Sequence, residues 1–201
     1  MMMMMMTKYL VLTLVVISSR PISIYAEKEL MMRECRNAQF PTVCMQCLES
    51  DPASVVAGSV AIAGIVINCL DSHLHTLIKQ VFSYIIIIKI ILTYSDFFIS
   101  PCNITELLSK KVKGHDEMKA ALKDCKKDLL VAMTLVPDAK NCLEAGDYNK
   151  AGQSIQLALG FPLQCRENLE TSKFQFSPSF RQIITIYAQL SVAAMRIIDR
   201  F

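Results

Sequence analysis

The sequence predicts an all-α protein, built as an up-down-up-down four-helix bundle that is preceded by an N-terminal helical hairpin. Apolar residues in the second half of the chain recur at alternating steps of three and four, the spacing of a helix packed in a bundle. Proline and glycine-aspartate signals divide this half into helices with short connections, which make neighbouring helices antiparallel. The 201 residues suit one domain with a sizeable core.

The N-terminus has the features of a secretory signal peptide. Lys8 precedes an apolar run over residues 9–17, and the small residue Ala26 stands directly before the charged sequence EKEL. The apolar run is shorter than the roughly 20 residues that a membrane-spanning helix needs. We therefore predict a signal peptide over residues 1–26 and an exported domain over residues 27–201.

The predicted export sets the charge and the redox state of the chain. Removal of residues 1–26 lowers the formal charge from +3 to +1, because Lys8 and Arg20 leave with them. A near-neutral chain without clusters of lysine or arginine argues against a nucleic-acid partner. In an oxidising compartment the cysteines are disulfide partners rather than thiolate catalysts. The eight cysteines are Cys35, Cys44, Cys47, Cys69, Cys102, Cys125, Cys142 and Cys165.

Residues 30–50 predict the helical hairpin. Pro41 disfavours a helical conformation at the residue before it, so the segment divides into two short helical pieces folded back on each other. Asp51 is placed to cap the next helix, with Pro52 at the first helical position. Over residues 53–70 the chain is almost uniformly small and apolar, which predicts a helix buried on most of its sides.

The first of three amphipathic helices follows later in the chain. Its predicted inward residues are Met118, Leu122, Cys125, Leu129, Ala132, Val136, Ala139 and Leu143. Pro137 is expected to kink this helix, because proline cannot donate a backbone hydrogen bond. Gly146 ends the helix, and Asp147 is placed to cap the next one.

The second and third amphipathic helices continue the pattern. Gly160 and Pro162 are weak points of the second helix, whose predicted inward residues are Tyr148, Ala151, Ile155, Ala158, Pro162, Cys165 and Leu169. The third helix begins at Ser177 and Pro178. Its predicted inward residues are Phe180, Ile184, Tyr187, Leu190, Ala194, Ile197 and Phe201.

Cys125 and Cys165 fall on the inward seams of two consecutive antiparallel helices. Cys125 precedes Gly146 by 21 residues, and Cys165 follows it by 19. At a rise of about 1.5 Å per residue, both reach nearly the same height along the bundle. A disulfide between them is therefore geometrically feasible.

Several motifs together carry a resemblance to a known family. They are CRNAQFPTVC between Cys35 and Cys44, CLESDP at 47–52, ALKDC at 121–125, GDY at 146–148, and Cys165 forty positions after Cys125. In this combination the chain resembles the plant invertase and pectin methylesterase inhibitors. The resemblance covers residues 27–201 apart from an apolar stretch near residues 78–102.

The resemblance implies a secreted enzyme inhibitor with no catalytic residues, no cofactor and no metal. Its implied partner is a plant carbohydrate-active enzyme, which it blocks in a non-covalent one-to-one complex in the cell wall (apoplast) or in the vacuole. The resemblance also implies two disulfides, Cys35 with Cys44 and Cys125 with Cys165. It assigns no partners to the remaining cysteines, Cys47, Cys69, Cys102 and Cys142.

The turn after the first amphipathic helix bears on the choice of target. Invertase inhibitors that resemble this chain often carry Pro-Lys-Phe directly after Gly-Asp, a motif that is absent here. Tyrosine after Gly-Asp is common in pectin methylesterase inhibitors, so the resemblance favours pectin methylesterase as the target, with invertase as the alternative. The predicted target-binding residues are Asp147, Tyr148, Asn149 and Lys150. The competing interpretation of Tyr148 is an ordinary residue of the helical seam.

The other motifs predict neither an enzyme nor a metal site. The sequence has no glycine-rich phosphate loop, no GxSxG elbow and no HExxH. Cys44 and Cys47 have CxxC spacing, but a zinc site would need a second such pair or two nearby histidines. The isolated pair His73 and His75 is better explained as part of a polar loop. Asn103 begins Asn-Ile-Thr, an acceptor for N-glycosylation in an exported protein.

Two hypotheses lie outside the inhibitor class. Eight cysteines in a small exported helical protein suggest a lipid-binding helical scaffold of the lipid-transfer kind, but the chain lacks the Cys-Cys and Cys-x-Cys neighbours of that family. The other hypothesis is a single-pass membrane protein anchored at the apolar stretch VFSYIIIIKIILTYSDFFI, residues 81–99. Lys89 lies near its centre, where a lysine costs about 2.5 to 3.5 kcal/mol on insertion scales, and Asp96 also lies within it. These charges argue against a membrane partner.

The same stretch makes the chain longer than the resemblance requires. Cys44 and Cys125 are 81 positions apart, more than in the relatives that the chain resembles. The flanking sequences would join into a continuous helix-turn-helix without residues 78–102. We hypothesise that these residues are an insertion translated from non-coding sequence. If they belong to the protein, we expect an extra apolar helix against the bundle, with exposed isoleucines.

Overall fold

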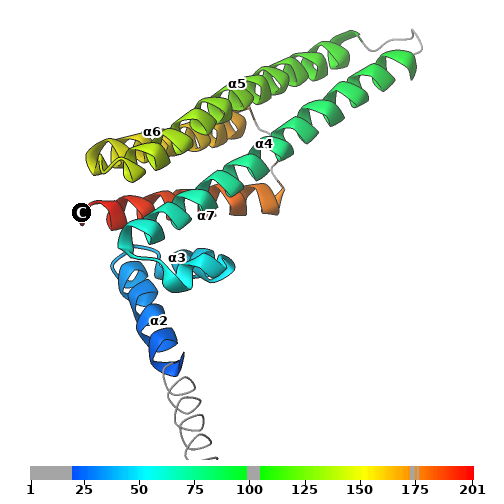
Figure 1. The fold of residues 1–201 in the computed structure, drawn as a ribbon. Helices are drawn as coiled ribbons and strands as arrows, with labels where there is room; N and C mark the ends of the chain where they lie inside the picture. Colours follow the sequence, from blue (N-terminus) through cyan, green and yellow to red (C-terminus); the bar gives the residue numbers. More distant parts are fainter. Residues whose placement is uncertain (1–19, 99–104, 173–174, 176) are drawn as a thin grey trace, which may run out of the picture.

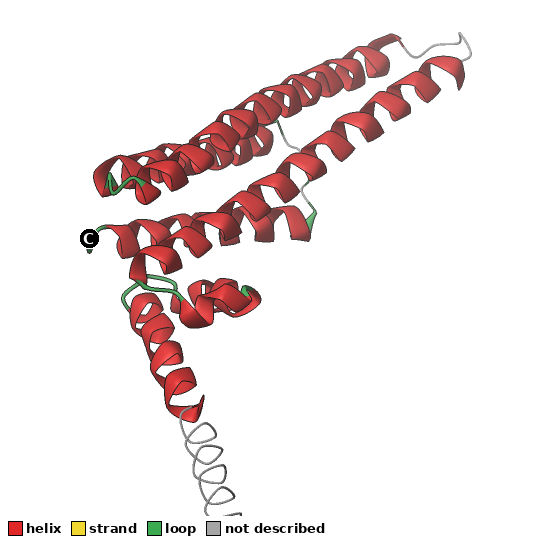
Figure 2. Ribbon diagram, viewed as in Figure 1, coloured by secondary structure: helices red, strands yellow, loops and turns green. Residues whose placement is uncertain are grey.

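The computed structural model describes residues 20–98, 105–172, 175 and 177–201, and the regular structure within them is entirely helical (Figure 2). The elements are α2 (Arg20–Arg36), α3 (Pro41–Ser50), the 3₁₀ helix η1 (Pro52–Val56), α4 (Ser59–Phe98), α5 (Thr105–Glu144), α6 (Tyr148–Thr171) and α7 (Pro178–Ile198). The predicted signal peptide lies mostly outside the described residues, and α2 runs through its predicted end at Ala26. Cys102 and Asn103 also lie outside them.

Helices α4 to α7 form the predicted up-down-up-down four-helix bundle. Each helix packs against the next one along the chain, and α7 packs against α4, which closes the bundle (Figure 1). The predicted hairpin is also present, because α2 and α3 pack against each other at one end of the bundle. The all-α fold class and this arrangement of helices are therefore confirmed.

The inward seams predicted for α5, α6 and α7 form most of the core. Every predicted seam residue is buried except Met118, Tyr148 and Phe201. Met118 and Tyr148 are half-buried and pack against the core. The prediction for Phe201 is wrong: α7 ends at Ile198, so Phe201 no longer follows the helical spacing and its side chain is 41% exposed.

The predicted start of the long apolar helix is also wrong. The Asp51 carboxylate accepts a hydrogen bond of 2.9 Å from the Ala53 backbone N–H, so it does act as a cap. The capped element is only the short helix η1, and Ala57 then adopts an extended backbone. Two adjacent β-branched valines at the end of η1 and the following Gly58 favour helix poorly, which explains why α4 begins only at Ser59.

The buried carboxylate of Glu34 connects the hairpin to the first residue of the bundle and to the C-terminal segment. Glu34 of α2 is only 5% exposed, and it accepts a hydrogen bond of 3.0 Å from the hydroxyl of Ser59 at the start of α4. The guanidinium of Arg200, just beyond α7, donates to the same carboxylate and, at 3.4 Å, to the Glu34 carbonyl. A disulfide between Cys47 of α3 and Cys69 of α4 adds a covalent attachment. Because a buried charge is tolerated only with partners, docking of the hairpin depends on both α4 and the C-terminus.

Helices α4 and α5 are longer than the other two helices of the bundle. Each has 40 residues, whereas α6 has 24 and α7 has 21. At 1.5 Å per residue the longer helices measure about 60 Å. Their ends next to residues 99–104 extend beyond α6 and α7 as an arm (Figure 1).

The apolar stretch continues α4 instead of forming the separate extra helix that we expected. No glycine or proline occurs between Gly64 and Pro101, so nothing in the local sequence ends the helix. Val81 and Ile88 are buried in the core. The hydroxyl of Tyr84 donates a hydrogen bond of 2.8 Å to the Ser177 hydroxyl, directly before α7. The first half of the stretch is thus packed into the bundle.

Candidate functional site

The turn between α5 and α6 has a backbone fixed by hydrogen bonds. Gly146 has a φ of +79°, a left-handed conformation that costs glycine little. The Asp147 N–H bonds the Cys142 carbonyl at 2.9 Å, and the Gly146 N–H bonds the Leu143 carbonyl at 3.1 Å. These two bonds are those of a Schellman motif, which satisfies the last carbonyls of a helix.

Asp147 fixes the other side of the turn. Its carboxylate accepts a hydrogen bond of 3.1 Å from the Lys150 backbone N–H, so it caps α6 as the sequence predicted. The side chains of Asp147, Asn149 and Lys150 are exposed. The structure therefore brings these predicted target-binding residues together on one rigid, solvent-facing turn.

Tyr148 lies in the same turn but has a second role. Its ring is half-buried and lies 5.1 Å from the ring of Phe201, with the two planes tilted by 56°. The competing interpretation of Tyr148 as a seam residue is thus partly correct. Phe201 is a surface residue of this site that sequence reasoning placed in the core. The polar pair Asp199 and Arg200 after Ile198 is the signal that could have shown the helix ending before it.

Two grooves flank this pair of rings. Tyr148 lines a groove of about 570 Å³ between α6 and α7, together with Asn149, Arg196 and Asp199. Phe201 lines a groove of about 850 Å³ between the start of α4 and the end of α5. The rings therefore form a ridge between the two grooves. A partner seated on the turn would meet an aromatic ridge with a depression on each side.

The second groove is mainly apolar, with charge at its edge. Gly58, Ala61 and Gly64 of α4 line it, and their lack of large side chains leaves the groove open. The Lys140 ammonium bonds the Asn68 side-chain carbonyl at 3.0 Å across the two helices. This bond holds α4 and α5 in fixed positions beside the turn.

A third groove, of about 730 Å³, lies between α5 and α6 further along the bundle. Gln153, Leu157 and Gln164 line it together with Asp128. Burial raises the pKa of the Asp128 carboxyl, and the neighbouring Asp124 raises it further, whereas Lys127 lowers it. The groove contains no histidine, cysteine or second carboxylate, so its residues do not form a set for acid–base or metal chemistry.

The cysteines of the described residues are almost all paired. The structure joins Cys35 to Cys44 and Cys125 to Cys165, the pairs that the resemblance implied, and it adds Cys47 with Cys69. Cys44 and Cys47 therefore belong to different disulfides and do not act as a CxxC pair. Among the described cysteines, Cys142 is a free thiol and is half-buried.

The histidine pair lies on α4 and not in a polar loop, so that interpretation is wrong. The His75 ring bonds the Asp71 carbonyl at 2.9 Å within the helix. Burial lowers the pKa of the neighbouring His73. Within the described part of the chain, no three side chains of His, Cys, Asp or Glu are grouped so that they could hold a metal ion.

One described helical stretch, Ser59–Ile90, is long and apolar enough to cross a membrane on length and composition alone, with a mean hydropathy of 1.4. The core helix of a soluble protein can meet the same criterion. Many residues of this stretch, from Ile62 to Val81, are buried against the other helices of the bundle. The core therefore accounts for the apolar character of the part from Ile62 to Val81.

The chain matches no protein-family profile and no curated protein in sequence. Its structure is similar to the crystal structure of mutant form A of a pectin methylesterase inhibitor from Arabidopsis, with a TM-score of 0.58 over 82% of this chain and 92% of that one, at 17% identity. The fold is that of the pectin methylesterase inhibitors. A crystal structure of a pectin methylesterase inhibitor from Arabidopsis thaliana also matches, with a TM-score of 0.53 over 84% and 93% of the two chains, at 17% identity.

The likeness extends over most of both chains. Each match spans more than nine tenths of the solved inhibitor chain, with 92% and 93% covered. At 17% identity the likeness concerns the fold alone. The pectin methylesterase inhibitor fold thus supplies a scaffold on which the turn, the aromatic ridge and its two grooves are displayed.

Proposed function

We propose that this protein is a secreted inhibitor of pectin methylesterase, which it blocks by docking over the substrate cleft in a non-covalent one-to-one complex in the cell wall. The observation that carries the proposal is the likeness of its fold, over 82% and 84% of the chain, to two solved pectin methylesterase inhibitors. The apolar N-terminal segment supports export. In this role the protein is a binding module and not an enzyme.

The rigidity of the turn suits such a role. The Schellman motif at Gly146 and the cap at Asp147 fix the backbone before a partner arrives. The disulfide between Cys125 and Cys165 ties together the two helices that the turn connects. A surface that is already ordered loses less conformational entropy on binding, which favours a tight complex.

The turn alone offers too little surface area for a stable complex. Specific protein interfaces bury about 800 Å² on each partner, whereas a four-residue turn offers roughly 300 Å². We infer that the interface extends over the ridge of Tyr148 and Phe201 and into at least one of the two flanking grooves. Aromatic side chains at such positions often dominate binding energy.

The choice between targets rests on the turn sequence. Tyr148, Asn149 and Lys150 follow Asp147, where the invertase inhibitors that resemble this chain often carry Pro-Lys-Phe. This difference favours pectin methylesterase. Invertase is the alternative target, and the two are separated by direct assay.

The test is a paired inhibition assay. Protein purified from the medium of a secreting host, with its disulfides formed, is titrated against a pectin methylesterase and against an acid invertase. We expect saturable inhibition of the esterase at one-to-one stoichiometry. Inhibition of invertase alone would replace the proposed target, and inhibition of neither enzyme would contradict the inhibitor function.

Two substitutions at exposed positions test where the interface with the target enzyme lies. Lys150→Glu should raise the inhibition constant at least about tenfold, which corresponds to about 1.4 kcal/mol. Lys123→Glu makes the same charge change at an exposed position of α5 outside the turn and its grooves, and it should leave inhibition unchanged. If Lys123→Glu weakens inhibition and Lys150→Glu does not, the turn is not the docking site.

A further inference from the structure

An apolar surface lies on the outer side of α4, where the arm leaves the bundle. We call it the isoleucine patch, and its members are Phe82, Ile86, Ile87 and Ile90, whose exposed fractions are 36%, 55%, 50% and 49%. Steps of three and four residues place them on one side of the helix, opposite the buried Val81 and Ile88. The candidate turn lies near the other end of α5, so the patch is not part of that site.

The described charged side chains of α4 beside the patch are lysines. Lys79 and Lys89 are exposed on α4 itself, which carries no acidic residue between Asp71 and Asp96. The ammonium of Lys126 on α5 lies 4.3 Å from the centre of the Phe82 ring. Cation and ring attract each other in this geometry, so the contact joins the basic side of α5 to the patch.

The adjoining face of α5 extends this basic border. Lys119 and Lys123 precede Lys126 by seven and three residues, so all three share one face of the helix. Lys119 and Lys123 are both exposed. Asp116 precedes Lys119 by three residues and shares this face, whereas Asp124 pairs with Lys127 at 2.9 Å and Asp128 lines the groove toward α6.

We propose that the isoleucine patch binds an anionic lipid surface, with α4 lying in the plane of the interface. Aliphatic side chains enter the boundary between headgroups and acyl chains, while the lysines bind lipid phosphates. Lys79, Lys119, Lys123 and Lys126 outnumber Asp116 beside the apolar strip, and this net positive border matches the chemistry of such a surface, which combines negative charge with an apolar layer. This is binding at the surface and not a membrane span, because Lys89 lies within the strip and the opposite side of α4 is packed in the bundle.

A second copy of the chain fits the patch less well. The four side chains are about half exposed and together offer roughly 300 to 400 Å², below the ~800 Å² that each partner buries in a specific interface. A symmetric dimer through this surface would also bring the lysine borders of the two copies close together, where like charges repel. Charge and area therefore both favour lipid.

The test is co-sedimentation of the secreted protein with vesicles. Two compositions are compared, pure phosphatidylcholine and phosphatidylcholine with 30% phosphatidylglycerol, each in low and in high salt. We expect binding to the anionic vesicles that falls at least tenfold at high salt and is near background on phosphatidylcholine, since charge attraction to a lipid surface is screened by salt. Binding that is equal on both vesicles, or absent from both, overturns the proposal.

Matched variants connect binding to the patch. The double variant Ile86→Ser/Ile87→Ser removes two exposed aliphatic side chains and should abolish binding, whereas Leu157→Ser removes an exposed leucine of α6 and should not change it. Lys123→Glu should weaken binding about tenfold or more, and Lys150→Glu, in the distant turn, should not. Circular dichroism and thermal unfolding confirm that each variant is folded.

Light scattering in the absence of lipid tests whether a second copy of the chain covers the isoleucine patch. A dimer that dissociates in Ile86→Ser/Ile87→Ser would show that a second copy covers the patch and would overturn the proposal, whereas a monomer supports it. The proposal is independent of the inhibitor function. Lys123→Glu affects lipid binding alone and Lys150→Glu affects inhibition alone, so failure of one proposal is distinguishable from failure of the other.

Discussion

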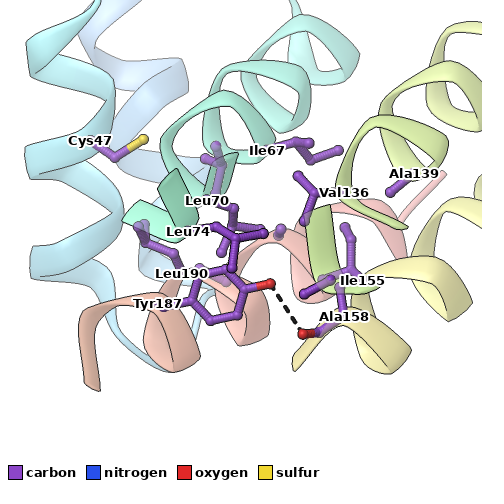
Figure 3. Close-up of a cluster of buried hydrophobic side chains, with 14 of the residues drawn as sticks. Cys47, Ile67, Leu70, Leu74, Val136, Ala139, Ile155, Ala158, Tyr187 and Leu190 are labelled. Atoms are coloured by element: carbon purple, nitrogen blue, oxygen red, sulfur yellow. Dashed lines mark hydrogen bonds between the residues drawn. The ribbon is translucent and has the colours of Figure 1, made fainter. Parts of the chain in front are cut away.

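The hydroxyl of Tyr187 on α7 donates a hydrogen bond of 3.2 Å to the carbonyl oxygen of Ala158 on α6 (Figure 3). Pro162 follows Ala158 by four residues and has no N–H, so this carbonyl lacks the usual partner within its own helix. Both side chains are buried, and burial raises the pKa of the Tyr187 phenol, which therefore stays protonated and able to donate. Tyr187 thus supplies from α7 the donor that Pro162 removes from α6.

The first prediction concerns this bond. Tyr187→Phe leaves the Ala158 carbonyl buried without a donor, and it should lower the free energy of unfolding by about 1 to 2 kcal/mol. Urea denaturation followed by circular dichroism measures the change.

Its control is the same substitution in a Pro162→Ala background. Alanine restores an N–H at position 162, so the Ala158 carbonyl regains an intrahelical donor and the cost of Tyr187→Phe should shrink. An equal cost in both backgrounds would mean that the hydroxyl does not act through Pro162.

Local sequence patterns predicted much of this fold, because they record periodic burial along single helices. The cap at Asp147 and the seam residues that include Leu122 and Tyr187 depend on neighbours within a turn or two. The helix that became α4 was predicted to start too early, because a uniformly apolar run has no periodicity to show at which residue a helix begins. The contact of Tyr148 with Phe201 was missed for a different reason: it joins the start of α6 to a residue beyond α7, and no local pattern encodes an approach between segments so far apart in the sequence.

The second prediction concerns the attachment of the hairpin to the bundle. Cys47→Ser/Cys69→Ser opens a loop with a sequence separation of 22. Chain-entropy estimates give about 3 kcal/mol for a loop of this size, so the variant should unfold at clearly lower urea concentration.

The contacts of Glu34 with Arg200 and Ser59 remain in that variant and should keep the hairpin docked. Adding Arg200→Ala leaves the buried carboxylate with only its longer ion pair to Arg33, at 3.5 Å, and limited proteolysis should then cut α2 or α3 before the bundle. Uniform cleavage across all helices would argue that the hairpin and bundle unfold as one unit.

The third prediction is a pH dependence of stability. Burial lowers the pKa of His73 below its ordinary value of 6.5. Below pH 6.5 the unfolded chain binds a proton at this site more readily than the folded chain, so stability falls as the pH drops from 6.5 toward the lowered pKa and is fully present above 6.5.

His73→Gln should remove this part of the acid destabilisation when unfolding is compared at pH 7.5 and pH 5.5. His75→Gln changes the exposed neighbour on the same helix and serves as the matched control. If both variants keep the pH dependence of the original protein, His73 is not its source.

The fourth prediction concerns the ridge beside the turn. Phe201→Ala removes the ring that packs 5.1 Å from Tyr148 and lines the groove between α4 and α5. Aromatic residues of this kind contribute about 1 to 3 kcal/mol at protein interfaces, so the inhibition constant against pectin methylesterase should rise by about 5- to 150-fold. Phe201 is exposed and lies beyond α7, so the free energy of unfolding should change by less than about 1 kcal/mol.

Leu157→Ala provides the comparison, because it shortens an exposed apolar side chain in the separate groove between α5 and α6. Inhibition by that variant should match the original protein. Equal losses in Phe201→Ala and Leu157→Ala would indicate a general dependence on exposed apolar surface, whereas a loss in Leu157→Ala alone would move the docking surface from the ridge to the α5–α6 groove. A loss confined to Phe201→Ala, at unchanged stability, places the ridge in the complex and shows that a residue predicted for the core seam contributes to binding at the surface.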